Sequence, residues 1–175
     1  MKNLHFLLRY SDKLSGADTI AEHSAVIAAN GSVWMGKFGI GMNQNFVKTA
    51  KLQLERGESC YLYLMHGSKF TCKASIIDVT AGSTSKTEIS SREPYLTPAY
   101  YRNKKCSIWF KLTSIEPINE AELKELWLYN NPSCHPSSSG MRGLVYLTHN
   151  SQPIDIPKKQ QEQERPSIYT EKLFD

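Results

Sequence analysis

Residues 59–79 restrict the fold of this chain more than any other stretch, because they carry the pattern of a β-hairpin. Residues 59–65 are dense in tyrosine and leucine, residues 66–68 (His-Gly-Ser) are typical of a turn, and residues 69–79 alternate apolar and polar side chains. A period of two residues places the apolar side chains of a strand on one face of a sheet. The sequence therefore predicts an antiparallel hairpin over residues 59–79.

Other segments show either the period of a strand or the period of a helix. Asp18 suits the N-cap of a first helix, and Asn30-Gly31 suits its left-handed end. Asn119, with Glu122 three residues later, resembles the capping box of a short helix that ends near Trp127. The expected strands are 3–10, 33–35, 106–115 and 143–148, and the expected helices are 18–30, 44–56 and 119–127.

Many strands with two or three helices favour an α+β fold, built as a curved mixed sheet or small barrel of about six strands with helices outside. The 175 residues are enough for one domain with a sizeable core. We expect residues 1–150 to form this domain. Residues 151–175 are rich in Gln, Glu, Lys and Pro and lack a core pattern, so we expect a flexible tail or linker there.

Composition narrows the classes of function. Lys and Arg number 21 against 17 Asp and Glu, and this net charge of +4 permits a nucleic-acid partner without demanding one. The four cysteines are widely separated and form no C-x-x-C pair, so we expect no zinc site, and no cofactor is predicted. The sequence shows no membrane-spanning run and no signal peptide, so we expect a cytoplasmic protein without a membrane partner.

The stretch from Gly31 to Phe38, Gly-Ser-Val-Trp-Met-Gly-Lys-Phe, contains candidate binding residues. Gly36 lacks a Cβ and allows a flat ligand or another backbone to approach closely. Trp34 offers a large π-face, and Lys37 offers a cation one step away, which suits a nucleobase beside a phosphate. The other interpretation, which stays open, is that Trp34 is a core aromatic on a short buried strand.

Residues 80–104 show no useful period, and a connection of this length is usually functional or mobile. It leads into the run Tyr-Tyr-Arg-Asn-Lys-Lys at 100–105, in which aromatic and basic side chains indicate a nucleic-acid contact loop. In the strand that follows, Trp109 faces away from the core if Ile108 and Phe110 face it. An exposed Trp109 is therefore a second candidate for binding, although cross-strand packing is its commoner use. His23, in the first helix, is expected to be half-exposed.

The order of these elements resembles the PUA-like superfamily, and most of all the EVE and YTH domains and the N-terminal DNA-reading domains of some McrB-type modification-dependent restriction proteins. The likeness covers residues 1–150 as an order of elements. The residues that carry it are His23, Gly31-Ser-Val-Trp34-Met-Gly36, Tyr61-Leu-Tyr63 and Trp109-Phe110-Lys111.

The resemblance implies a domain that holds a single modified base, flipped from a duplex or taken from a single strand, in an aromatic cage. Trp34 matches the tryptophan that forms one cage wall in YTH domains. Their second wall commonly comes from the long loop between middle strands, and this loop offers tyrosines in place of a tryptophan. The implied cage residues are Trp34, Tyr95, Tyr100, Tyr101 and Trp109.

Selection of a methylated base requires more than stacking. Extraction of a base costs a few kcal/mol, stacking returns about 1–3 kcal/mol per base, and a methyl group adds only about 0.8 kcal/mol. A snug pocket with hydrogen bonds to the base edge is therefore required. The candidates are Ser32, Asn43 and Asn45 for the base edge, and Lys37, Arg102, Lys104 and Lys105 for phosphates.

The function implied by the resemblance is that of a reader without catalytic activity. It would recognise a methylated base in DNA, such as N6-methyladenine or 5-methylcytosine, as the specificity module of a modification-dependent restriction or defence system. A motor NTPase or a nuclease, in the same chain or a neighbouring one, would be its partner. A reader of modified RNA on the same fold is the alternative, because nothing in the sequence separates DNA from RNA.

Two other classes of function stay open. The ASCH group of small PUA-like domains resembles amidohydrolases that use a lysine and a glutamate, for which Lys37 or Lys73 with Glu22 or Glu93 are the candidates. An aromatic patch around Trp109 would also suit a protein-interaction domain that docks a peptide. Salt dependence separates these classes, because binding led by phosphates weakens steeply as salt is added.

Overall fold

The predicted hairpin lies at the centre of the fold. The computed structural model describes residues 3–11, 18–38, 43–136 and 144–150. Strands β3 (Tyr61–His66) and β4 (Lys69–Ala81) pair antiparallel around a turn in which Gly67 has a φ of 63°. This positive φ explains why a glycine stands at the turn.

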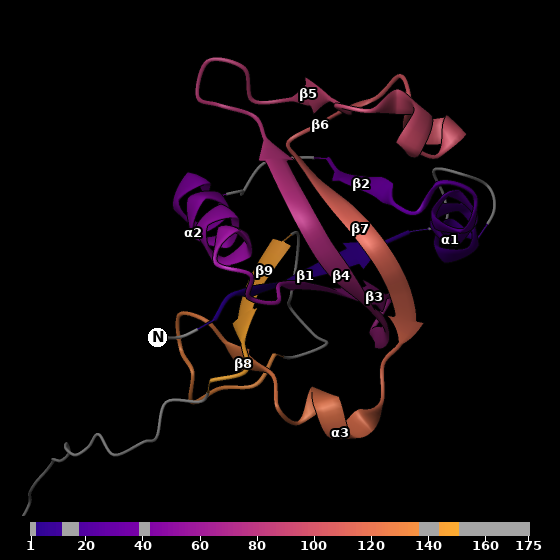
Figure 1. Ribbon diagram of the computed structural model, residues 1–175. Helices are drawn as coiled ribbons and strands as arrows, with labels where there is room; N and C mark the ends of the chain where they lie inside the picture. The colour runs from indigo at the N-terminus through magenta and orange to yellow at the C-terminus, as the bar shows by residue number, and fades with distance from the viewer. Residues whose placement is uncertain (1–2, 12–17, 39–42, 137–143, 151–175) are drawn as a thin grey trace, which may run out of the picture.

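The hairpin is part of a mixed seven-stranded sheet with the order β2-β7-β4-β3-β1-β9-β8 (Figure 1). β1 and β3 are parallel, and the other neighbours in this sheet are antiparallel. The predicted α+β fold with a mixed sheet is confirmed, with seven strands in place of about six. The remaining strands of the sheet are β1 (His5–Tyr10), β2 (Val33–Lys37), β7 (Ile108–Pro117), β8 (Trp127–Leu128) and β9 (Leu144–Thr148).

Three helices accompany the sheet, and their caps agree with the sequence. The Asp18 carboxylate accepts a hydrogen bond from the N–H of Ala21, and Gly31 ends the first helix with a φ of 91°. The Asn119 side chain caps the third helix by accepting from the N–H of Glu122. The helices are α1 (Thr19–Asn30), α2 (Gln44–Glu55) and α3 (Glu120–Leu123).

The expected end of the third helix near Trp127 is wrong. α3 ends at Leu123, and Trp127 begins β8, where it pairs with Thr148. Leu126 is fully buried in an apolar cluster with Leu7 and Tyr63. Burial of Leu126 under the sheet explains why the chain leaves the helix after a single turn.

The main core fills the face of the sheet that α1 and α2 cover. Strand β1 divides its side chains between two faces, because Leu4, Phe6 and Leu8 lie in this core, whereas Leu7 lies in the cluster with Tyr63. Strand β7 also divides its side chains, because Ile108 and Phe110 lie in the main core, whereas Trp109 lies in a third cluster. The opposite face of the sheet therefore carries Leu7 and Trp109, each in a separate cluster.

Residues 80–104 are not the structureless loop that the sequence suggested. They contain strand β5 (Ile89–Ser90), which pairs with β6 (Lys105–Cys106), and two short 3-10 helices between them. These helices, η1 (Pro94–Leu96) and η2 (Ala99–Tyr101), lie beyond β2 at the top of Figure 1. Helical turns this short have no period that a sequence could display.

Among the described residues, no helix is long and apolar enough to cross a membrane.

Candidate functional site

The predicted cage residues converge at the β2–β7 edge of the sheet. Trp34 on β2 lies opposite Lys111 on β7, and Gly36 lies opposite Trp109, so both indoles project from the same face. Segment 89–106 packs over this face. We call the result the aromatic cluster, and its members are Trp34, Leu96, Tyr101, Cys106 and Trp109, with Phe38, Ile89 and Tyr100 packed against them.

Both tryptophans of the aromatic cluster are buried. Trp109 is 0% exposed, its ring centroid lies 5.7 Å from that of Tyr101, and its indole N–H donates to the Ile89 carbonyl at 2.8 Å. The prediction that Trp109 faces away from the aliphatic core is confirmed. Its expected exposure is wrong, because segment 89–106 covers that face of the strand.

Gly36 provides the close approach that the sequence indicated, but the flat group that uses it belongs to the protein. A Cβ at position 36 would lie 2.8 Å from a ring carbon of Trp109 and 2.6 Å from the Cys106 sulfur. Those distances are shorter than van der Waals contact. Gly36 therefore allows the Trp109 indole to lie flat against β2.

Glu93 connects the aromatic cluster to the solvent-exposed rim. Its Oε1 accepts hydrogen bonds from the Trp34 indole N–H and the Lys111 ammonium, each at 2.8 Å. Its Oε2 accepts from the Tyr95 hydroxyl at 3.0 Å. The hydrogen bonds from Lys111, Trp34 and Tyr95 lower the pKa of Glu93 to about 2, so the carboxylate is ionised at neutral pH.

Tyr95 is the exposed member of the predicted cage, and the residue is 65% exposed at the rim of the aromatic cluster. Tyr100 is half-buried, and its ring centroid lies 4.5 Å from that of Tyr101. Trp34, Tyr100, Tyr101 and Trp109 are thus brought together, with Tyr95 joined to them through Glu93.

His23 lies beneath this group and is fully buried, so the expected half-exposure is wrong. Its ring centroid lies 5.9 Å from Tyr101, which covers α1 from η2. Its Nδ1 contacts the Thr19 carbonyl at 2.8 Å, which assigns the ring proton to Nδ1. Burial lowers the pKa of His23 to about 4, against a smaller opposing effect of that hydrogen bond.

The predicted phosphate ligands divide into two groups. The Nε of Arg102 donates to the carbonyls of Pro94 (3.2 Å) and Thr97 (3.1 Å), so this side chain joins η1 to η2. Lys37 donates to the Phe38 carbonyl at 2.7 Å, and burial lowers its pKa. Lys104 and Lys105 are exposed on the same segment.

The predicted base-edge residues lie apart from the aromatic cluster or beneath the surface. Ser32 is 8% exposed, between α1 and β2. The Asn43 side chain caps α2 by accepting from the N–H of Asn45 at 2.9 Å, and both asparagines are exposed at the start of a helix that packs against β4. Their role at a base edge stays a prediction, and the adjoining residues 39–42 lie outside the described residues.

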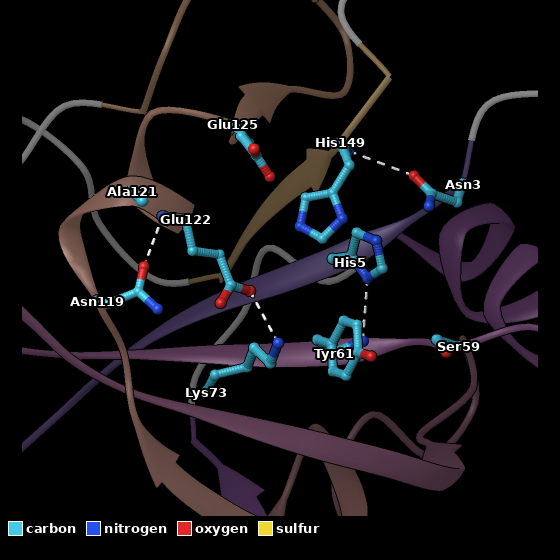
Figure 2. Close-up of a pocket in the computed structure, with 10 residues that line it drawn as sticks. All are labelled: Asn3, His5, Ser59, Tyr61, Lys73, Asn119, Ala121, Glu122, Glu125 and His149. Carbon is cyan, nitrogen blue, oxygen red and sulfur yellow. Dashed lines mark hydrogen bonds and ion pairs between the residues drawn. The ribbon is translucent and has the colours of Figure 1, made fainter.

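A second group of polar side chains lines a cavity of about 540 Å³ at the β1–β3–β4 part of the sheet (Figure 2). The Lys73 ammonium lies 2.9 Å from Glu122 Oε2, and the Tyr63 hydroxyl donates to the same oxygen at 2.8 Å. His149 Nε2 lies 2.7 Å from the Tyr63 oxygen. The cavity is lined by Asn3, His5, Ser59, Tyr61, Lys73, Asn119, Ala121, Glu122, Glu125 and His149.

These hydrogen bonds determine the charge of the cavity. Burial alone would raise the pKa of Glu122, but the hydrogen bonds from Lys73 and Tyr63 outweigh it and lower that pKa. The same carboxylate raises the pKa of Lys73 against the effect of burial. Burial lowers the pKa of His149, so this ring is neutral beside an ion pair at neutral pH.

The lysine–glutamate pairs considered for an amidohydrolase do not correspond to the ion pairs that form. Among the described residues, Lys73 pairs with Glu122 and Lys111 pairs with Glu93. The protonated state of Lys73 also disfavours it as a nucleophile or base. No three His, Cys, Asp or Glu side chains in the described ranges are arranged to hold a metal.

The fold and the aromatic cluster together define a small α+β domain with a mixed sheet and aromatic side chains gathered at one sheet edge. The family model described as Pua-like matches residues 6–144, so the chain belongs to the Pua-like family. No curated protein matches the sequence. The PUA-like part of the resemblance is confirmed, and the narrower likeness to EVE, YTH and McrB-type domains stays a prediction.

Proposed function

We propose that this Pua-like domain binds nucleic acid and reads a methylated base at the aromatic cluster. The observation that carries the proposal is the convergence of Trp34 on β2 with Glu93 and Tyr101 of segment 89–106. Two aromatic faces and a fixed carboxylate supply both requirements of base recognition, which are stacking and a polar contact at the base edge.

A base reaches Trp34 in this proposal only when η1 moves. Trp34 is 0% exposed. It packs in one cluster with Leu96 and Tyr101, which are themselves only 6% and 7% exposed. η1 contains only Pro94–Leu96, and its Tyr95 is already at the surface. The incoming base takes the place of Leu96. Stacking of the base contributes about 1–3 kcal/mol, which offsets part of the free energy needed to displace Leu96.

Glu93 favours a base that carries an amino group. A carboxylate only accepts hydrogen bonds, and the N6 amino group of adenine and the N4 amino group of cytosine donate them. N6-methyladenine retains one such N–H, and 5-methylcytosine retains two. The exposed Lys104 and Lys105 on the covering segment are suited to the neighbouring phosphates.

The wider role that we propose is that of a specificity module without its own catalysis. A motor NTPase or nuclease, in the same chain or a neighbouring one, would act on the modified DNA that this domain selects. The same cluster would hold a modified base in RNA, which is the second candidate substrate.

Fluorescence anisotropy tests the proposal with matched DNA and RNA oligonucleotides that are unmodified or carry N6-methyladenine or 5-methylcytosine. The variants are Trp34→Phe, which narrows the stacking face, and Tyr95→Ala at the exposed rim. Ile77→Ala serves as the control, because Ile77 is a 47% exposed apolar side chain on β4.

We expect one modified oligonucleotide to bind best, and each of the two site variants to weaken it by about tenfold, within the range for loss of base stacking. Ile77→Ala should retain the preference. Equal binding to all oligonucleotides, unchanged in Trp34→Phe and Tyr95→Ala, would contradict the reader function.

A further inference from the structure

The cavity in Figure 2 has the size of a small-molecule site and is separate from the aromatic cluster. Its volume of about 540 Å³ lies within the range of about 300–1,000 Å³ that ligand pockets occupy. None of its lining residues belongs to the aromatic cluster. They come from β1, β3 and β4, from residues just before β1 and β3, from α3 and the residues beside it, and from the residue directly after β9.

His5 brings an unused hydrogen-bond donor to this cavity. Its Nδ1 accepts a hydrogen bond from the N–H of Tyr61 at 3.0 Å, so the ring proton resides on Nε2. The side chain is 0% exposed, and its Nε2 has no hydrogen-bond partner among the described residues. A buried donor without an acceptor costs about 1–3 kcal/mol, so a ligand that supplies an acceptor gains by satisfying it.

The cavity also restricts the charge of a ligand. Lys73 and Glu122 neutralise each other, the rings of His5 and His149 are neutral, and Glu125 adds one negative charge. An anion such as a phosphate would therefore meet an unfavourable field. A simple cation fits no better, because it lacks the acceptor that His5 requires and would lie near the Lys73 ammonium.

Tyr61 lines the cavity with an aromatic ring. Its ring stacks with His5 at a centroid distance of 5.3 Å and an interplanar angle of 26°. The Lys73 ammonium lies 4.3 Å from the same ring centroid, so the ring already contacts both groups. A planar ligand would contact the accessible part of Tyr61 and reach His5 and Glu125 with its polar edge.

We propose that this cavity is a second binding site, for a neutral planar molecule that carries an amino donor next to an acceptor, as adenine and cytosine nucleosides do. The acceptor receives the His5 N–H, and the amino group donates to the Glu125 carboxylate. The site does not depend on the reader function of the aromatic cluster.

NMR titration of the full chain tests this proposal with adenosine, cytidine, uridine and cytidine 5′-monophosphate. Ring 15N signals of His5 and His149 report the cavity, and indole N–H signals of Trp34 and Trp109 report the aromatic cluster. The variants are His5→Phe, which removes the donor, and Glu125→Gln, which changes an exposed residue. Glu120→Gln is the matched control, because Glu120 lies in α3 but does not line this cavity.

We expect adenosine or cytidine to shift the histidine signals. Uridine should bind about tenfold more weakly, as loss of a hydrogen bond to a charged group predicts, and the monophosphate should bind more weakly because its charge meets that of Glu125. Glu125→Gln should weaken the binding of the favoured nucleoside and reduce the difference in affinity between that nucleoside and the monophosphate. Glu120→Gln should change neither.

Two results would overturn the proposal. One is that no amino-bearing nucleoside shifts the histidine signals, and the other is that binding persists unchanged in both His5→Phe and Glu125→Gln. Shifts confined to the indole signals would assign the ligand to the aromatic cluster, and would thereby support the reader function while rejecting the cavity as a site.

Discussion

Gly36 and Trp109 lie directly across from each other on β2 and β7, and the Trp109 indole fills the space that a side chain at position 36 would need. Trp109 in turn donates to the Ile89 carbonyl, which fixes the covering segment to the sheet. The edge of the sheet and segment 89–106 therefore depend on each other through one glycine.

Gly36→Ala should destabilise the fold. The added Cβ would lie 2.8 Å from the Trp109 ring, and overpacking of this kind costs about 1–3 kcal/mol. Urea denaturation measures the loss, and the indole N–H signal of Trp109 should shift in the same variant. Thr113→Ala, at an exposed position of β7, is the control and should change neither quantity. A Gly36→Ala protein of native stability would show that the indole moves aside at little cost.

Glu93→Gln should loosen the aromatic cluster while the sheet stays intact. Gln retains an acceptor for the Trp34 indole, but it loses the ion pair with Lys111. We expect faster hydrogen exchange at the Trp34 indole N–H, measured by NMR. Glu88→Gln is the control, because Glu88 is exposed directly before segment 89–106. Equal exchange rates in the wild type and Glu93→Gln would show that the ion pair does not hold η1 in place.

The stability of the protein should decrease at acidic pH because its buried histidines become protonated on unfolding. Burial lowers the pKa of His23 from 6.5 to about 4, so the unfolded chain binds more protons than the folded chain between these values. Stability contributed by neutral His23 is complete above pH 6.5 and decreases as the pH falls toward 4. The slope is on the order of 1.4 kcal/mol per pH unit for each such group.

Urea denaturation at several pH values between 7 and 4 measures this slope, and His23→Asn should reduce it. His5, whose pKa is lowered to about 3 by burial and by His149 and Lys73, contributes a slope of the same sign and remains in the variant. An identical slope in the wild type and in His23→Asn would contradict the assignment of His23.

The elements of the fold were predictable because burial imposes a local period. β1 and the first part of β7 alternate their side chains between two environments, whereas β4 shifts register near Ile76. Asp18 and Asn119 mark helix starts within three residues of the groups that they cap. The convergence of Trp34 with tyrosines of the long segment was also expected, from the resemblance to cage-forming domains.

The contacts that complete the two sites were not predictable from local pattern. Glu93 bonds to Trp34 across 59 positions of sequence, and Tyr63 contacts His149 across 86. Such pairs depend on strand order and register, and no period in the sequence encodes either. The burial of Trp109 and His23 was missed for the same reason, because segment 89–106 covers both from a distance in the chain.

Arg102 should act on the covering segment more than on a phosphate. Its Nε donates to the carbonyls of Pro94 and Thr97, and this geometry suits a guanidinium better than an ammonium. Arg102→Ala and Arg102→Lys should both raise the amide exchange of Leu96 and Tyr101 severalfold, with a loss of global stability below about 1 kcal/mol because the side chain is exposed.

The comparison of these two variants separates the structural role of Arg102 from an electrostatic one. If Arg102 mainly contacts a phosphate, Arg102→Lys should retain nucleic-acid affinity and the wild-type exchange rates, whereas Arg102→Ala loses affinity. If it mainly joins η1 to η2, both variants should show the same faster exchange. Lys104→Ala is the control, because it removes an exposed cation two residues away and leaves the Arg102 hydrogen bonds in place. Wild-type exchange in Arg102→Lys would therefore contradict the structural role.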